Sequence, residues 1–221
     1  MKLSGTEIEV VTNPYSQSAA PIDRDYDDSI TSLLVKGTWN DNLVDFMVKK
    51  NIKGLYLNSA KGFSCDDFSF LSKLPDLELL NIIHSPVDSL SVVGQLTYLK
   101  SLSISCHWKE KVDLSALTQL ERCFISYGKG GESIFDCHSL KYLYLDGFKL
   151  KAYEALTKLH KLEYLTIGNS SFNQAELFPE LKQLRKLVVQ VKMELKKNVH
   201  MVENMVMLIK KLKLILSQDM W

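Results

Sequence analysis

The chain has 221 residues, of which 46% are hydrophobic and 24% are charged, so it has room for one large domain or two small ones and the composition of a soluble globular protein. Its 27 basic and 26 acidic residues give a formal charge of +1, and no basic stripe with interleaved aromatic residues occurs, which argues against a nucleic-acid partner. The N-terminus lacks the apolar core of a signal peptide and no segment has the length of a membrane span, so we expect a cytoplasmic protein without stable membrane insertion, with secretion by a signal-independent route left open.

Residues 1–29 are predicted to form an N-terminal cap and loop. The stretch TEIEVV at 6–11 suits a short strand, and a loop that contains proline and aspartate follows it. A cap is needed because the repeats that come next share one core, which their first unit would otherwise expose.

A repeated pattern, L-x-x-L-x-L, dominates residues 30–191. Its alternating part suits a strand that turns every second side chain into a core, and apolar residues at every third position upstream suit a short 3₁₀ or helical return. One such unit cannot bury its own apolar face, but stacked units share a continuous core. The steps between units are 22, 25, 22, 21, 20, 22 and 22 residues, and the first positions are Ile30, Ile52, Leu77, Leu99, Leu120, Leu140, Leu162 and Leu184.

At these residues the sequence resembles the leucine-rich repeat family, and the step length and the L-x-x-L-x-x-L returns are similar to its short bacterial, internalin-like class. The resemblance covers about residues 30–191 in about eight units. It implies an α/β solenoid: an arc with a parallel β-sheet on the concave face and short helical or 3₁₀ returns on the convex face. The family's Asn or Cys three residues after the last strand leucine is mostly missing, and these positions hold Thr38, Ala60, Ser85, His107, Gly128, Phe148, Ser170 and Lys192. We therefore expect other contacts to hold the loops.

Residues 192–221 are predicted to form a C-terminal capping helix that closes the core over the last repeat. The same helix is open to two other interpretations: it docks a partner or a second copy of the chain, giving a homodimer, or it lies as a basic amphipathic helix on a membrane surface. Its apolar stripe consists of Val202, Met205, Val206, Ile209, Leu212 and Leu216.

The residues between the strand leucines point to the concave face, opposite the core. Aromatic side chains gather there toward the middle and C-terminal half, and aromatic and arginine side chains dominate interface hot spots, although tyrosine is also simply a good strand residue. The predicted partner-binding residues are Tyr56, Arg122, Phe124, Tyr127, Lys129, Tyr142, Tyr144, Asp146 and Tyr164. Four aromatic residues just past their strands either extend this surface or pack locally: Trp39, His84, His107 and Trp108.

The stretch YGKGGES at 127–133 looks at first like a loop that cradles a phosphate. It lacks the GxxxxGK[ST] consensus, and no helix with the required spacing follows it. It falls in the shortest unit, so we interpret it as a flexible glycine turn within a contracted repeat, with Ile134 and Phe135 refilling the core.

The sequence predicts neither an enzyme nor a bound cofactor. No GxSxG, HExxH or paired Cys/His signature occurs, and the four cysteines are expected to be free thiols. The leading hypothesis is a non-catalytic protein-protein interaction module that binds a macromolecular partner through its concave face and adjoining loops. Within that class, an immunity protein that neutralises a bacterial toxin and an effector that engages a host protein both fit. A scaffold assembled through the C-terminal helix and an unusual hydrolase using His107 or His138 are the alternatives.

Overall fold

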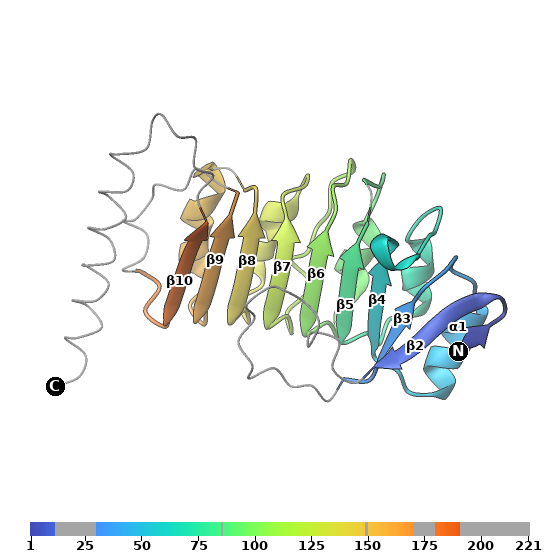
Figure 1. The fold of residues 1–221 in the computed structure, drawn as a ribbon. Helices are drawn as coiled ribbons and strands as arrows, with labels where there is room; N and C mark the ends of the chain where they lie inside the picture. The colour runs from blue at the N-terminus through green and yellow to red at the C-terminus, as the bar shows by residue number, and fades with distance from the viewer. Residues whose placement is uncertain (12–29, 85, 149, 170–179, 191–221) are drawn as a thin grey trace.

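The computed structural model describes residues 1–11, 30–84, 86–148, 150–169 and 180–190, which form one ten-stranded sheet (Figure 1). The strands stand in the sheet in the order in which they occur in the chain, and β3 to β10 are parallel. The strands are β1 (Lys2–Leu3), β2 (Thr6–Val11), β3 (Ser32–Val35), β4 (Gly54–Asn58), β5 (Leu79–Ile83), β6 (Ser101–Ser105), β7 (Arg122–Ser126), β8 (Tyr142–Asp146), β9 (Tyr164–Gly168) and β10 (Lys186–Gln190). The strand predicted for each repeat is therefore confirmed.

Most of the short helices of the described chain lie behind the sheet in Figure 1 and return the chain from one strand to the next, whereas η2 directly follows the end of β4. They are α1 (Asn42–Lys49) and the 3₁₀ helices η2 (Ser59–Lys61), η3 (Ser69–Lys73), η4 (Ser91–Gln95), η5 (Gly131–Asp136) and η6 (Leu150–Lys158). The spacing of apolar residues did not predict α1, which turns Leu43 and Met47, one helical turn apart, into the core. Residues 114–120 form turns rather than a helix, yet their three leucines are fully buried.

The core lies between the sheet and these returns. Leu33, Leu80 and Leu143 occupy the same place in their strands and are 0%, 0% and 3% exposed. Burying a leucine side chain contributes about 1.5–3 kcal/mol, and neighbouring units supply the contacts, so the stack and not the unit is what folds. The predicted α/β solenoid with strands on one face and short helical returns on the other is confirmed.

The N-terminus pairs with the first repeat. β2 spans the predicted strand 6–11 and runs antiparallel to β3. The Thr6 hydroxyl donates to the Thr38 carbonyl at 2.6 Å and accepts from Asn40 Nδ2 at 2.8 Å, which ties the cap to the loop after β3. The division into a cap (1–29), repeats (30–191) and a terminal helix (192–221) stays a prediction, because residues 12–29 and 192–221 lie outside the described residues.

A ladder of alternating charges stands where the strands begin. The residue before each strand from β4 to β10 is charged, and its sign alternates along the stack: Lys53, Glu78, Lys100, Glu121, Lys141, Glu163 and Arg185. Ion pairs join Lys100 to Glu78 at 2.7 Å, Lys141 to Glu121 at 3.0 Å and Arg185 to Glu163 at 3.4 Å. The backbone N–H of each member from Glu78 onward donates to the carbonyl of the previous member. These contacts join neighbouring units at the strand starts, the opposite strand ends from the positions where the usual Asn is mostly missing.

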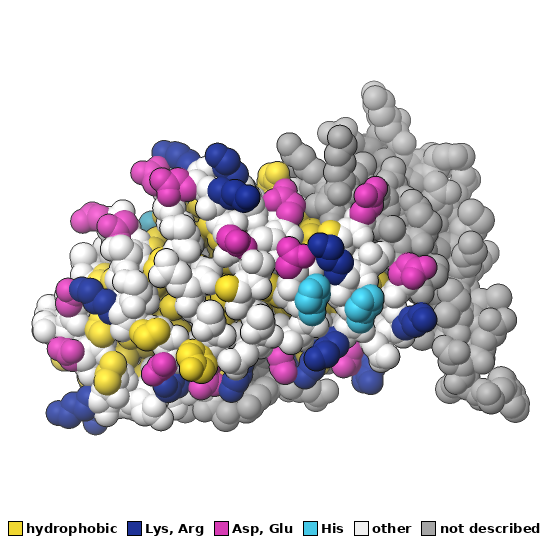
Figure 2. Space-filling view, turned by 180° about the vertical axis from the view of Figure 1, so that it is seen from behind, with side chains coloured by type: hydrophobic (Ala, Val, Ile, Leu, Met, Phe, Trp, Pro, Cys, Tyr) yellow, Lys and Arg dark blue, Asp and Glu magenta, His cyan; other side chains and the backbone are white. Residues whose placement is uncertain are grey.

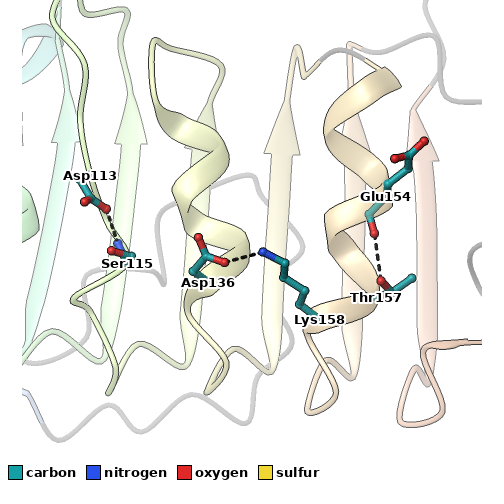
Figure 3. A network of polar contacts seen from close by, with 6 residues as sticks. All are labelled: Asp113, Ser115, Asp136, Glu154, Thr157 and Lys158. Atoms are coloured by element: carbon teal, nitrogen blue, oxygen red, sulfur yellow. Dashed lines mark hydrogen bonds and ion pairs between the residues drawn. The ribbon is translucent and has the colours of Figure 1, made fainter.

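The return side carries an ordinary mixed polar surface. Figure 2 views the molecule from behind the sheet and shows acidic and basic side chains interspersed over the returns. Figure 3 shows polar contacts along the same returns: Lys158 Nζ meets Asp136 Oδ1 at 2.8 Å and so joins η6 to η5, while the Ser115 N–H donates to Asp113 Oδ1 at 3.0 Å within one turn. None of the helices in the described part of the chain has the length and apolar character needed to cross a membrane.

Candidate protein-binding surface

The concave face is the face of the sheet that looks away from the core, and its two halves differ. On β3 to β6 much of it is closed: Ser32, Leu79, Asn81 and Ser101 are each at most 7% exposed. The prediction of Tyr56 as a binding residue assumed an exposed side chain, and the structure corrects that assumption, because Tyr56 is only 7% exposed. It lies on β4 beside Asn81 of β5, in this closed half, so its ring has almost no surface to present to a partner.

On β7 to β9 the concave face carries partly exposed aromatic side chains that the structure brings together. Parallel register sets Arg122 of β7 beside Tyr142 of β8 and Tyr142 beside Tyr164 of β9. One column further along the strands, Phe124 stands beside Tyr144. We call these five residues, which the sequence predicted as binding residues, the aromatic patch: Arg122, Phe124, Tyr142, Tyr144 and Tyr164.

The rings of the aromatic patch are stacked in pairs. The Phe124 and Tyr144 centroids are 4.5 Å apart at 27°, and those of Tyr142 and Tyr164 are 4.6 Å apart at 5°. Neighbouring strands in a sheet are about 4.7–4.9 Å apart, so rings at paired positions meet face to face without leaving their strands. Such pairs contribute about 0.5–1.5 kcal/mol beyond the area they bury.

The charge of Arg122 lies on the same stack. Its guanidinium carbon is 4.2 Å from the centroid of the Tyr142 ring, at a distance where the negative face of the ring attracts a cation. Arg122, Tyr142 and Tyr164 therefore form one continuous row across three strands.

Tyr144 is held by its neighbours on β8 and β9. Burial, followed by the Asp146 carboxylate, raises the pKa of the Tyr144 hydroxyl above its ordinary value. Asp146 itself accepts from Asn169 Nδ2 at 2.6 Å and from the Ser126 hydroxyl at 3.3 Å. A Cβ atom at Gly168 would lie 2.6 Å from the Tyr144 hydroxyl oxygen, so only glycine leaves room for the ring as it stands.

The loop after β7, residues 127–133, borders the aromatic patch and forms a glycine turn, as predicted, whose backbone is held by hydrogen bonds. Backbone and side-chain hydrogen bonds tie it to the preceding unit: Trp108 Nε1 and the Val112 N–H both donate to the Lys129 carbonyl at 3.0 Å. Gly130 has a φ of +82°, a conformation that favours glycine, and η5 follows it at once. As predicted, Ile134 and Phe135 fill the core, with 0% and 1% exposed.

The two binding residues predicted on this loop have different surroundings. The Tyr127 ring packs edge-on against Phe148 at 5.4 Å, and the Glu132 carboxylate raises the pKa of its hydroxyl. Lys129 is exposed, and it is its backbone carbonyl that accepts the hydrogen bonds from Trp108 and Val112.

Of the four aromatic residues just past the strands, Trp39, His84 and Trp108 pack against their surroundings, whereas His107 is exposed beside Tyr127. Trp39 stacks on Phe70 at 3.8 Å, and His84 packs edge-on against Phe63 and Phe68. Trp108 is 5% exposed. His107 places Nδ1 3.2 Å from the Tyr127 carbonyl.

A hollow with both polar and apolar side chains in its walls lies at the loops after β4 and β5. It has a volume of about 390 Å³ and is lined in part by Cys65, Asp67, His84 and Asp88. Asp67 Oδ1 accepts the Ser69 N–H at 2.7 Å and Asp88 pairs with Lys109 at 2.6 Å, so local structure engages two of the three carboxylates that line the hollow, the third being Asp66. Burial raises the pKa of the Cys65 thiol to about 12, which leaves it protonated and a weak nucleophile at neutral pH.

Two residues beside the aromatic patch were not predicted as part of the site. Lys186 of β10 is exposed and pairs in register with Tyr164, so it ends the row that Arg122 begins. Its place in the same column as Tyr142 and Tyr164 was a usable signal. The role of Gly168 had no signal, since it depends on where the Tyr144 hydroxyl lies in three dimensions.

Solved structures share this architecture. The chain is similar to internalin C2 from Listeria monocytogenes, with a TM-score of 0.54 and 15% identity over 74% of this chain and 82% of that one. It is also similar to the plant peptide hormone receptor RGFR1, solved in complex with RGF2, with a TM-score of 0.50 and 16% identity over 75% of this chain and 28% of that one. Neither a protein-family model nor a curated protein sequence matches the chain. At these identities the likeness shows the fold, which is that of a leucine-rich repeat solenoid.

Proposed function

We propose that the chain is a non-catalytic protein-binding module whose partner contacts the aromatic patch, with Tyr127 and Lys129 at the border of the contact. One observation carries the proposal: large aromatic side chains are stacked and partly exposed on β7 to β9, where a merely solvated sheet face would suit Thr, Lys or Glu equally well. Aromatic and arginine side chains in such clusters dominate the energetics of protein interfaces.

The geometry supports a rigid docking surface. Each ring of the patch is already held by a neighbour, Tyr142 by Tyr164 and Phe124 by Tyr144. Ordering a mobile side chain at an interface costs about 0.5–1.5 kcal/mol, so side chains that are fixed before association leave more of the contact energy for affinity. The fold analogy with a peptide hormone receptor solved in complex with RGF2 favours a macromolecular partner, although fold alone carries no function.

A binding role also agrees with the state of the thiols and histidines. Burial raises the pKa of Cys106 to about 11 and that of Cys137 to about 12, which disfavours a thiolate nucleophile. Within the described residues, no group of three or more His, Cys, Asp and Glu side chains is arranged to hold a metal ion. The proposal gives His107 and His138 no catalytic role.

The biological role within this class depends on the partner. An immunity protein that binds a toxin and an effector that binds a host protein would use the same surface, and a toxin gene immediately upstream would favour the first. Homodimerisation through residues 192–221 is a separate arrangement that lies outside the described residues. Light scattering on the full chain tests it, because a monomer at all concentrations would remove it.

The deciding experiment changes Tyr142, Tyr144 and Tyr164 to Ala together. The partner is captured with the wild-type chain from an extract of the native organism and identified, and its affinity for each variant is then measured by calorimetry alongside melting temperature. We expect a loss of at least about 30-fold, since hot-spot residues contribute about 2 kcal/mol or more.

A matched control is Tyr98→Ala, which removes a tyrosine that is 53% exposed and lies in a return, away from the patch. Its affinity should stay within about twofold of wild type. A folded triple variant with unchanged affinity would rule out the aromatic patch as the binding surface.

Lys129 tests the border of the contact. Lys129→Ala keeps the backbone carbonyl that accepts from Trp108 and Val112, so the melting temperature should not change. If the side chain contacts the partner, affinity falls by about threefold to fivefold, the range of an exposed ion pair or hydrogen bond.

A further inference from the structure

We propose that His138 and His160 form a chelating pair that binds a late first-row divalent metal ion, such as Ni²⁺ or Cu²⁺, on the return side of the solenoid. The pair is separate from the aromatic patch, which lies on the concave face, so the proposal goes beyond the proposed function and does not rest on it. It follows from the register of two repeats, from the exposure of both residues and from the chemistry of imidazole.

The two histidines hold the same position in consecutive repeats. Each is the second residue of a four-residue turn that leads into a strand, residues 137–140 before β8 and residues 159–162 before β9. In both turns the last backbone N–H donates to the first carbonyl, at 3.1 and 3.0 Å. The turns are 22 residues apart, which is also the step that pairs β8 with β9 in register. The same turn is therefore stacked twice, with a histidine at the same corner each time.

Contacts before and after the turns join the two repeats at this place. Two residues before the histidines, Lys158 Nζ lies 2.8 Å from Asp136 Oδ1, and these residues also hold equivalent positions (Figure 3). Three residues after the histidines, the Lys141 carbonyl accepts from the backbone N–H of Glu163 at 2.9 Å. Because neighbouring parallel strands are about 4.7–4.9 Å apart, corners that lie between these two contacts bring their side chains within reach of each other.

His138 and His160 are both exposed, and among the described residues neither ring has a hydrogen-bonding or ionic partner. Figure 2 shows histidine side chains gathered on this side of the molecule. The surroundings of two other histidines differ, since His84 packs edge-on against aromatic rings and His107 places Nδ1 3.2 Å from the Tyr127 carbonyl. The ring nitrogens of the pair are therefore open to a ligand from solution.

A pair of imidazoles favours one class of ion. Neutral imidazole is a ligand for nickel, copper and zinc, whereas magnesium and calcium take oxygen ligands. Metal–nitrogen bonds are about 2.0–2.1 Å long, so two nitrogens on one ion are roughly 3 Å apart, which rings on adjacent repeats reach by rotating about their side-chain bonds. Once one ring has bound, binding of the second is intramolecular, so the pair holds the ion more tightly than either ring alone.

The pair supplies two ligands and leaves the other positions of the ion open. In the described part of the chain, no group of three or more His, Cys, Asp and Glu side chains is arranged to hold a metal ion, and the Asp136 carboxylate is already paired with Lys158. Water or a group from another molecule fills the remaining positions. The site is thus a surface chelate rather than a closed structural metal site.

The test is a calorimetric titration of the full chain, without a histidine tag, with Ni²⁺ in the presence of excess Mg²⁺. H138A and H160A should each weaken the binding of Ni²⁺ by at least about tenfold, and the double variant should lose little more, since either change removes the chelate. Both residues are exposed, so the melting temperature of each variant should match that of the wild type. An unchanged affinity in H138A or H160A, or losses that simply add in the double variant, would overturn the proposal.

The matched control is H107A. His107 is also exposed, but the corresponding positions in the neighbouring repeats hold Ser85 and Gly128, so it has no second histidine beside it. Affinity for Ni²⁺ should stay within about twofold of wild type. A loss as large as that of H138A would contradict the assignment to the pair.

The register of the repeats is tested by moving the pair along the stack. Thr118 is exposed and holds the corresponding corner in the repeat before that of His138, in a turn closed by the same kind of backbone hydrogen bond at 3.1 Å. The variant H160A/T118H rebuilds a pair of adjacent histidines at positions 118 and 138. Its affinity for Ni²⁺ should return to within about threefold of wild type.

The control for this rescue places the new histidine at the same corner one repeat further away. Thr97 is exposed and lies two repeats before His138, at roughly 10 Å, which is too far for two imidazoles to share one ion. H160A/T97H should therefore bind Ni²⁺ as weakly as H160A alone. Rescue by T97H, or no rescue by T118H, would contradict chelation by histidines on adjacent repeats.

Discussion

The two halves of the sheet bury the same types of side chain in the core but carry different side chains on the concave face. Leu33 and Leu80 in the N-terminal half and Leu143 in the C-terminal half are all at most 3% exposed. On the concave face, in contrast, Tyr56 in the first half is 7% exposed, whereas Tyr142 of the second half keeps part of its ring open to solvent. The buried leucines are therefore alike along the whole solenoid. The side chains of the concave face differ, and they divide it into a closed half on β3 to β6 and an open half with partly exposed aromatic residues on β7 to β9.

This difference separates stability from binding. A tyrosine in the closed half removes apolar surface from water on folding, so it stabilises the stack. A tyrosine in the open half keeps part of its apolar surface exposed after folding, and a partner can bury that surface on binding. Two chemically identical residues on one face are thus expected to respond very differently to the same substitution.

The largest effect is expected from truncating these two tyrosines. Tyr56→Ala should lower the free energy of unfolding by about 3 kcal/mol, the cost typical of removing a buried aromatic ring, whereas Tyr164→Ala should cost about 1 kcal/mol, mainly the lost stacking on Tyr142. Urea unfolding followed by circular dichroism measures both. Equal losses would break the distinction between the closed and the open half.

A smaller loss is expected from adding one methyl group on the concave face of the open half. Gly168→Ala sets a Cβ atom 2.6 Å from the Tyr144 hydroxyl, so the ring must move away from its place against Phe124. We expect about 1–3 kcal/mol of destabilisation and weaker partner binding. Thr166→Ala, two residues earlier on the same face, creates no such clash and serves as the control; if both variants bind alike, the exact placement of Tyr144 does not matter.

Alkaline pH is expected to stress the half beneath the patch, which holds Cys123 and Cys137 in its core. Burial raises the pKa of the Cys137 thiol from 9.0 to about 12, so the folded state keeps a proton that the unfolded chain releases above about pH 9. Stability is therefore fully present below pH 9 and falls as the pH rises toward 12. The melting temperature should drop by about 3 °C or more between pH 8 and pH 10.5.

Cys137→Ser isolates this contribution. The serine hydroxyl can still donate to the Leu114 carbonyl, as the thiol does at 3.2 Å, but it does not titrate in this range. The alkaline drop should be smaller in the variant, and an unchanged drop would assign it to other groups.

The smallest effect concerns what the two halves share, the alternating charges at the strand starts. Lys141→Glu sets a third negative charge between Glu121 and Glu163, and Lys100→Glu does the same between Glu78 and Glu121 in the other half. Each should cost about 1 kcal/mol, because the exposed pair is lost and repulsion replaces it, and high salt should reduce the loss. Unequal losses would show that the ladder does not act alike along the stack.

The strands and core of the solenoid could be predicted because they depend on residue spacing alone. Leu143 and Leu145 alternate with Tyr142 and Tyr144, and this alternation of apolar residues predicts a strand. The regular step between units then predicts that the next strand lies beside it. The helix α1 was not predicted, because the first repeat buries Leu43 and Met47 at helical spacing rather than apolar residues at every third position. The spacing of apolar residues therefore predicts the regular units but not a unit whose return differs from the others.

The candidate site was predictable only in part, for a related reason. That Tyr142 and Tyr164 share a column follows from counting, and their stacking follows from the distance between strands. Whether an outward side chain is covered does not follow from its column, as Tyr56 shows. The hydrogen bond that the Lys129 carbonyl accepts from Trp108, 21 residues earlier, likewise could not be predicted from the sequence of the loop.

The alternating charges at the strand starts repeat with a period of two units. From Lys53 to Arg185 positive and negative residues alternate without a break, so every junction between units joins opposite charges. Removing or duplicating a single unit would set like charge against like at one junction, whereas a pair of units can enter or leave without disturbing the order. Lengths that differ by two units are therefore the ones we expect this solenoid to tolerate, which makes the smallest exchangeable segment of the protein a couple of repeats and not one.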